Sequence, residues 1–202
     1  MKFLHAGAIY AAANVVSAAI PFLMLPLLTR VLTPADYGHV VAFALLVTLC
    51  MPFAGLSVHS AVGVAWFNKP RTEIPPFNGM ALGLIVVTTA MTAPIVAAVV
   101  MLMPTLAADL PPAWGAVAAL TAGANVLLQC RLILWQSQSQ PLKSAIVQVS
   151  ASLLNIALSL LAVLSFGLGG AGRNSGIAVA AIAMAVVSAV MFVHSRDAEI
   201  GR

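Results

Sequence analysis

The feature that most constrains this chain is the spacing of its few charged residues. Asp, Glu, Lys and Arg make up 7% of the 202 residues and leave six long intervals without a charge. The intervals are Lys2 to Arg30, Asp36 to Lys69, Glu73 to Asp109, Asp109 to Arg131, Lys143 to Arg173, and Arg173 to Arg196. Each provides the roughly 20 helical residues that cross a hydrocarbon core of about 30 Å. We therefore predict six membrane-spanning segments.

The apolar content excludes a water-soluble fold. Hydrophobic residues make up 62% of the chain. Charged residues make up only 7%, whereas a soluble domain has about 25%. The apolar runs are continuous rather than alternating, which favours helices over the strands of a membrane barrel. We predict an all-α polytopic transmembrane bundle of six helices, with residues 1–202 forming a single lobe. The expected spans are approximately 6–29, 39–65, 79–103, 113–135, 143–166 and 175–194.

Six spans place both ends of the chain on one side of the membrane, and the basic residues divide unequally between the two sides. One side receives two of the nine basic residues, Arg30 and Arg173. The other side receives the remaining seven, which are Lys2, Lys69, Arg71, Arg131, Lys143, Arg196 and Arg202. Because cytoplasmic loops are enriched in Lys and Arg, we predict that both termini are cytoplasmic. On the outer side, Arg30 is expected to pair with Asp36.

The same distribution argues against several function classes. The net charge of +4 comes from scattered basic residues without an aromatic platform, so no nucleic-acid partner is expected. No acid lies in mid-span, and no His/Cys/Asp/Glu cluster or Gly-rich phosphate loop is present in the sequence. Cys50 and Cys130 lie inside apolar runs and lack metal-binding spacing. We therefore predict that the chain is not an enzyme and has no catalytic residue, metal or cofactor.

Five polar side chains are the candidates for a substrate-binding cavity: Asn14, His59, Arg131, Gln148 and Asn155. His59 is the one ionisable residue well inside a span, which makes it a functional candidate, or else a neutral histidine bonded to a neighbouring helix. The amides, together with Asn125 and Gln129, are expected either to line a hydrophilic cavity or to join helices. Arg131 and Lys143 are placed to attract a phosphate at the cytoplasmic face, although the positive-inside bias alone accounts for both.

Two motifs early in the chain carry a family resemblance. An apolar first helix ends in Leu27-Leu28-Thr29-Arg30, and Pro34-Ala35-Asp36-Tyr37-Gly38 follows after a short segment. This stretch resembles the opening of polysaccharide biosynthesis membrane proteins, the Wzx-type lipid-linked oligosaccharide flippases. The region 136–154, with Pro141, Gln148, Ser152 and then Asn155, is similar to the passage from the fourth to the fifth helix in that family.

The resemblance implies a fold and an activity. Such proteins belong to the multidrug/oligosaccharidyl-lipid/polysaccharide exporter superfamily, in which two six-helix lobes surround a central cavity and alternate between inward-open and outward-open states. The implied substrate is a polyprenyl-pyrophosphate-linked glycan, moved from the cytoplasmic to the periplasmic leaflet of the bacterial inner membrane. Many members carry a basic residue near the position of Val64 and Ala65, which this chain lacks.

The chain has room for only one lobe, so a second lobe is the expected partner, either another copy of this chain or a separate polypeptide. We therefore expect a flippase lobe for cell-surface polysaccharide such as lipopolysaccharide O-antigen, in contact with membrane lipid. A truncated, inactive copy is an alternative. Two rival hypotheses are a small-molecule exporter of the same superfamily and a non-transporting scaffold for glycan-assembly enzymes.

Overall fold

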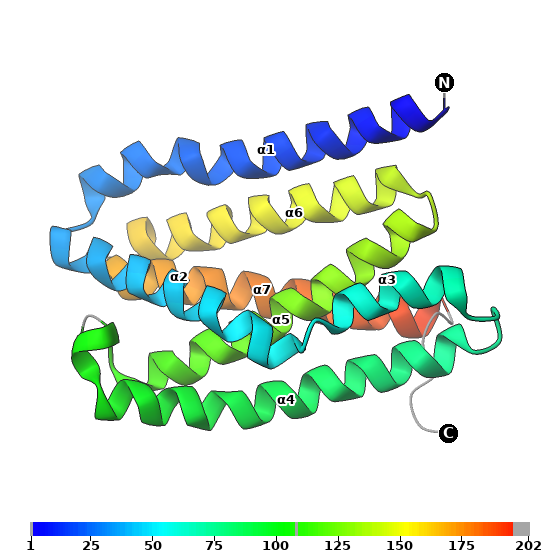
Figure 1. The fold of residues 1–202 in the computed structure, drawn as a ribbon. Helices are drawn as coiled ribbons and strands as arrows, with labels where there is room; N and C mark the ends of the chain where they lie inside the picture. The colour runs from blue at the N-terminus through cyan, green and yellow to red at the C-terminus, as the bar shows by residue number, and fades with distance from the viewer. Residues whose placement is uncertain (1, 108, 196–202) are drawn as a thin grey trace.

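A computed structural model describes residues 2–107 and 109–195. Its elements are all helical within those residues. In chain order they are α1 (Lys2–Val31), α2 (Pro34–Gly55), α3 (Val58–Asn68), α4 (Ile74–Leu102), the 3-10 turn η1 (Pro104–Ala107), α5 (Pro112–Ser137), α6 (Pro141–Leu160), the π-helical turn η2 (Leu161–Ser165) and α7 (Gly169–His194). The predicted all-α architecture is confirmed (Figure 1).

Six helices of the described chain are long and apolar enough to cross a membrane. They cover Tyr10–Val31, Pro34–Gly55, Ile74–Leu102, Pro112–Ser137, Pro141–Ser165 and Gly169–His194. Five of them overlap the predicted spans, and their ends differ from the predicted ends by a few residues. The second differs, because the predicted span 39–65 is divided between α2 and α3.

The division falls at Leu56 and Ser57, which both have left-handed backbone conformations, with φ values of 43° and 56°. Each left-handed residue costs roughly 1–2 kcal/mol. Thr88 of α4 offsets part of this cost, because its hydroxyl donates a hydrogen bond of 2.6 Å to the Ala54 carbonyl freed by the break. Gly55 also lies so close to α5 that a Cβ there would be 2.7 Å from Val126 Cγ1. The break therefore occurs where α4 supplies a hydrogen-bond donor to the freed carbonyl and α5 packs against the backbone.

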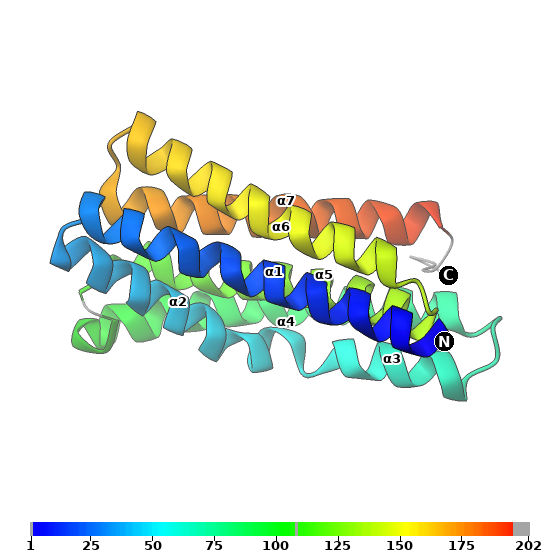
Figure 2. The same ribbon diagram turned by 90° about the horizontal axis from the view of Figure 1, so that it is seen from above.

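Helix α5 lies at the centre of the bundle and packs against α2, α3, α4, α6 and α7. Helix α1 packs mainly along α6, which in turn packs along α7 (Figures 1 and 2). Small residues permit the close contacts: a Cβ on Gly123 of α5 would lie 2.1 Å from Thr89 Oγ1 of α4. Close backbone approach of this kind is how helices gain packing energy in lipid.

The bundle has two chemically different ends. At the end called here the basic end, α1 begins, α3 turns into α4, α5 turns into α6, and α7 ends (right in Figure 1). Lys69, Arg71, Arg131 and Lys143 all lie toward this end. Arg196 and Arg202 lie outside the described residues. The common placement agrees with the predicted sorting of charge, while the cytoplasmic assignment of this end remains a prediction.

At the opposite end, Asp36 joins the turn between α1 and α2 to the start of α7. Its carboxylate accepts hydrogen bonds from the Thr33 hydroxyl (2.7 Å) and from the Gly170 N–H (3.1 Å). The expected pairing of Asp36 with Arg30 is not found, since Lys69 and Glu73 form the only ion pair among the described residues. The carboxylate instead caps the N-terminus of α7, where the helix dipole favours a negative charge.

Replacing Gly170 with Ala is expected to destabilise the protein. A Cβ at Gly170 would lie 2.7 Å from the Asp36 carbonyl oxygen, which is backbone and has little freedom to move. We expect a loss of about 1–3 kcal/mol in the free energy of unfolding, measured by SDS titration in mixed micelles. Gly83→Ala is the control, because a Cβ there meets nothing within 4 Å. Equal stability of the two variants would contradict the close corner contact.

Candidate functional site

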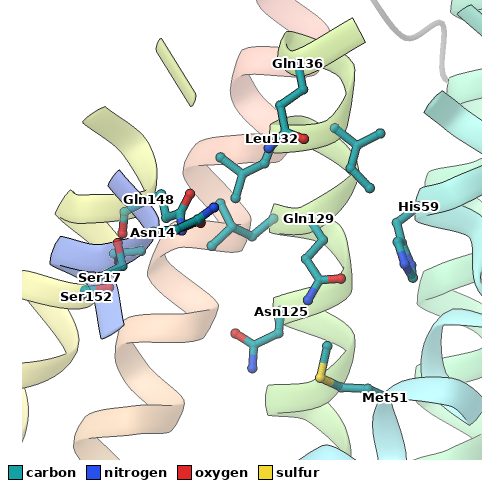
Figure 3. Close-up of a pocket in the computed structure, with 13 residues that line it drawn as sticks. Asn14, Ser17, Met51, His59, Asn125, Gln129, Leu132, Gln136, Gln148 and Ser152 are labelled. Atoms are coloured by element: carbon teal, nitrogen blue, oxygen red, sulfur yellow. Dashed lines mark hydrogen bonds between the residues drawn. The ribbon is translucent and has the colours of Figure 1, made fainter. Parts of the chain in front are cut away.

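An open cavity of about 560 Å³ lies between α1 and α6 on one side and α2, α3 and α5 on the other (Figure 3). Eight of its thirteen lining residues are polar, and they come from four of these helices. These are Asn14 and Ser17 of α1, His59 of α3, Asn125, Gln129 and Gln136 of α5, and Gln148 and Ser152 of α6. Leu, Ile and Ala side chains and Met51 complete the wall.

Helix α5 supplies the amides of the central wall because of their spacing along the sequence. Asn125 and Gln129 are four residues apart, and Gln136 follows seven residues later, so all three lie on one face of the helix. Ala118, Ala119 and Ala122 of the same helix are fully buried in the apolar core with α2 and α4. One helix thus presents small residues to its neighbours and amides to the cavity.

Two of the predicted site residues contact each other directly. Gln148 Nε2 of α6 donates a 2.7 Å hydrogen bond to Asn14 Oδ1 of α1. The bond joins the two helices, and the same side chains line the cavity (Figure 3). The two interpretations left open by the sequence, helix-joining bond and cavity lining, therefore both apply to this pair.

His59 projects into the cavity from the side opposite Asn14 (Figure 3). Its position follows from the helix break, because His59 lies in the first turn of α3, just after Ser57. Its Nδ1 atom and the Ser17 hydroxyl are buried and have no hydrogen-bond partner within the described part of the chain. Buried polar atoms in native proteins almost always have a partner, so a buried water or a small side-chain rearrangement is required to satisfy these two atoms.

A second cavity of about 220 Å³ adjoins the first one and continues toward the end opposite the basic end. The two cavities share Asn125 and Ser152, and the second adds Asn155 of α6 and Arg173 of α7. Arg173 Nη1 donates hydrogen bonds to Asn155 Oδ1 (2.6 Å) and to the Ser159 hydroxyl. The guanidinium Nε has no partner among the described atoms. The site therefore holds a cation that is oriented by neutral groups.

Sequence reasoning did not identify Arg173 as a site residue, because it placed this residue in the loop before the span 175–194. The structure places it in the first turns of α7, with its side chain on α6. Two signals were present in the sequence. Arg173 is a basic residue on the side that the positive-inside rule leaves poor in charge, and Asn155 and Ser159 are spaced to share one face of α6.

Arg131 lies apart from the other four predicted site residues. It lines neither of the two cavities and is 3% exposed. Its guanidinium carbon is 4.4 Å from the centre of the Trp135 ring and 4.8 Å from that of Phe192. Its Nη2 atom donates a 3.0 Å hydrogen bond to the Ser195 hydroxyl. Arg131 thus belongs to a separate pocket at the basic end.

The two adjoining cavities offer amides, hydroxyls, an imidazole and one guanidinium, and no described carboxylate lines either one. Such groups suit a ligand that has many hydroxyls and a negative charge. No family model, curated protein or solved structure matches the chain in comparisons of its sequence and structure. The functional argument therefore rests on the residues of this chain.

The cavity is expected to contain water, which can be tested with an introduced cysteine. In a background with Cys50→Ala and Cys130→Ala, Ser152→Cys should react readily with a charged, membrane-impermeant thiol reagent in opened membranes. The reason is that a thiolate forms in water and not in lipid. Leu153→Cys, whose native side chain is 53% exposed on the apolar surface, is the neighbouring control and should react at least about tenfold more slowly. Equal rates for the two cysteines would argue against a hydrated cavity.

Proposed function

We propose that this chain is one six-span lobe of a flippase that moves polyprenyl-pyrophosphate-linked oligosaccharide across the bacterial inner membrane. The observation that carries the proposal is the amide-lined cavity of about 560 Å³ within a bundle of membrane-length helices. Polar groups facing lipid without partners are costly, so a cavity of this kind is expected to serve a polar cargo.

The chemistry of the wall suits a glycan. Amide side chains both donate and accept hydrogen bonds, as sugar hydroxyls do. Asn125 and Gln129 lie on the α5 wall, and Ser152 lies across from them on α6 (Figure 3). His59 of α3 adds an imidazole to the same wall. The cavity volume is also in the range of about 300–1,000 Å³ that is usual for small-molecule sites.

Arg173 suits the charged part of the same substrate. A guanidinium forms strong, oriented hydrogen bonds with phosphate oxygens, and the bonds to Asn155 and Ser159 hold this one in place. We propose that Arg173 pairs with the pyrophosphate while the amides contact the sugars. No bond is made or broken in this process, which consists of binding and a change between two conformations of the bundle.

A second lobe is proposed to cover the cavity. Asn14 and Gln136 line the cavity and are exposed in the isolated chain, which places polar groups where lipid would otherwise lie. If both ends of the chain face the cytoplasm, as the charges predict, a second lobe of the same orientation would face this wall in parallel. Another copy of the chain or a separate six-span polypeptide would each meet this requirement.

The proposal is tested in bacterial cells that lack their own flippase, by measuring lipid-linked glycan delivered to the cell surface. The chain is expressed alone and together with a candidate second half, and its amount in the membrane is measured. We expect delivery to be restored. Lack of delivery by a well-expressed chain in both settings would contradict the proposal, and capture of glycan-assembly enzymes without delivery would favour the scaffold alternative.

Arg173→Gln is expected to lower delivery by about 10–100-fold, since a hydrogen bond to a charged group contributes about 1.5–3 kcal/mol. Arg173→Lys keeps the charge and loses the planar guanidinium, so its delivery should lie between that of the unmodified protein and that of Arg173→Gln. Arg30→Gln is the matched control at the same end of the bundle, because Arg30 is exposed and lines neither of the two cavities. An equal loss in the Arg30 and Arg173 variants would show that the effect is not specific to the cavity.

A further inference from the structure

A separate pocket of about 400 Å³ lies at the basic end, where α3, α5, α6 and α7 meet. It is lined by side chains from the last turns of α3 and α5, the turn between α5 and α6, the first turn of α6 and the end of α7. These are Trp66, Arg131, Trp135, Gln138, Gln140, Lys143 and Ser195. None of these residues lines the cavity of about 560 Å³.

Arg131 gives the pocket a cation of fixed orientation. Its side chain is 3% exposed and is held by the rings of Trp135 and Phe192 and by the Ser195 hydroxyl. A cation in a loop would satisfy the positive-inside rule equally well. The positive-inside rule therefore does not explain why this guanidinium is buried near the end of a span, where burial of a charge is costly. The rings and the hydroxyl orient the planar group before any ligand binds.

The start of α6 adds positive potential to the same pocket. Lys143 lies in the first turn of α6, is exposed, and takes part in no ion pair within the described chain. Gln140 precedes the helix and makes no side-chain hydrogen bond to its N-terminus. The first backbone N–H groups of a helix lack partners in the helix and attract anions. The helix terminus, Lys143 and Arg131 thus converge on one pocket.

The aromatic side chains indicate the depth of the pocket. Trp66 and Trp135 lie near the ends of their helices, at the level where indoles gather between hydrocarbon and headgroups. Arg71 lies 3.5 Å from the centre of the Trp66 ring and adds a further cation beside the pocket. Lipid phosphates occupy this same level of a membrane.

We propose that this pocket binds the phosphate group of an anionic membrane lipid, with Arg131 and Lys143 as the contacting cations. The site is distinct from the cavity proposed for transport, and its occupant is a resident lipid rather than the cargo. The lipid would bridge the ends of α5, α6 and α7. Binding does not depend on glycan transport, so the two proposals can fail separately.

The test compares lipid binding by Lys143→Gln and Lys69→Gln proteins. Lys69 is a matched control, because it lies at the same end, pairs with Glu73 and does not line the pocket. Each purified variant is reconstituted in nanodiscs of phosphatidylcholine with or without an equal amount of phosphatidylglycerol. Lipid retained after brief extraction is then measured by mass spectrometry. We expect about fivefold less retained phosphatidylglycerol for Lys143→Gln, and no change for Lys69→Gln.

Three outcomes would overturn the proposal. Equal retention by the two variants would show that the pocket has no special affinity for anionic lipid. Displacement of phosphatidylglycerol by excess inorganic phosphate would assign the pocket to a free anion. A lower unfolding temperature of Lys143→Gln than of Lys69→Gln in neutral detergent, without anionic lipid, would assign Lys143 to folding. A rise in unfolding temperature with phosphatidylglycerol, present for Lys69→Gln and reduced for Lys143→Gln, would support the lipid site.

Discussion

Every backbone N–H and C=O group that enters hydrocarbon needs a hydrogen-bond partner within the protein, and this requirement shapes the whole fold. It accounts for the six long helices that form the candidate spans. The predicted span 39–65 is interrupted at Leu56 and Ser57, and the Thr88 hydroxyl of α4 donates a hydrogen bond to the Ala54 carbonyl that the interruption releases. The interruption is therefore confined to a place inside the bundle, where it also aims His59 at the cavity.

Helix α5 shows how one helix supports both the core and the site. Its alanines and Gly123 allow α2 and α4 to approach closely, and the dispersion attraction between these tightly packed helices does not depend on water. Its amides face the other way, where α1 and α6 stand far enough from α3 to leave a cavity. The α5 residues that pack against α2 and α4 are thus separate from those that line the cavity.

The spans and the sorting of charge could be predicted from the sequence because both follow from the cost of placing charge in hydrocarbon. The break in the second span could not, since Pro52 and Gly55 are also compatible with a continuous membrane helix and the left-handed residues are a leucine and a serine. For the site, Asn14, His59, Gln148 and Asn155 were selected as polar groups in apolar runs, and they line adjoining cavities. Arg131 lies beside Lys143 at the basic end, as the sequence predicts, but its separation from the cavities and the contact of Arg173 with α6 depend on how α5, α6 and α7 pack.

The clasp between Asp36 and Gly170 has a mechanical consequence. It ties the two helix turns together at one end of the bundle, while α1 and α3 diverge toward the other end (Figure 1). Helix α1 has 30 residues and extends about 45 Å from that corner, packed along α6. A tilt of α1 by about 5° about this corner would displace its far tip by about 4 Å, and the hydrogen bond between Asn14 and Gln148 opposes such a tilt.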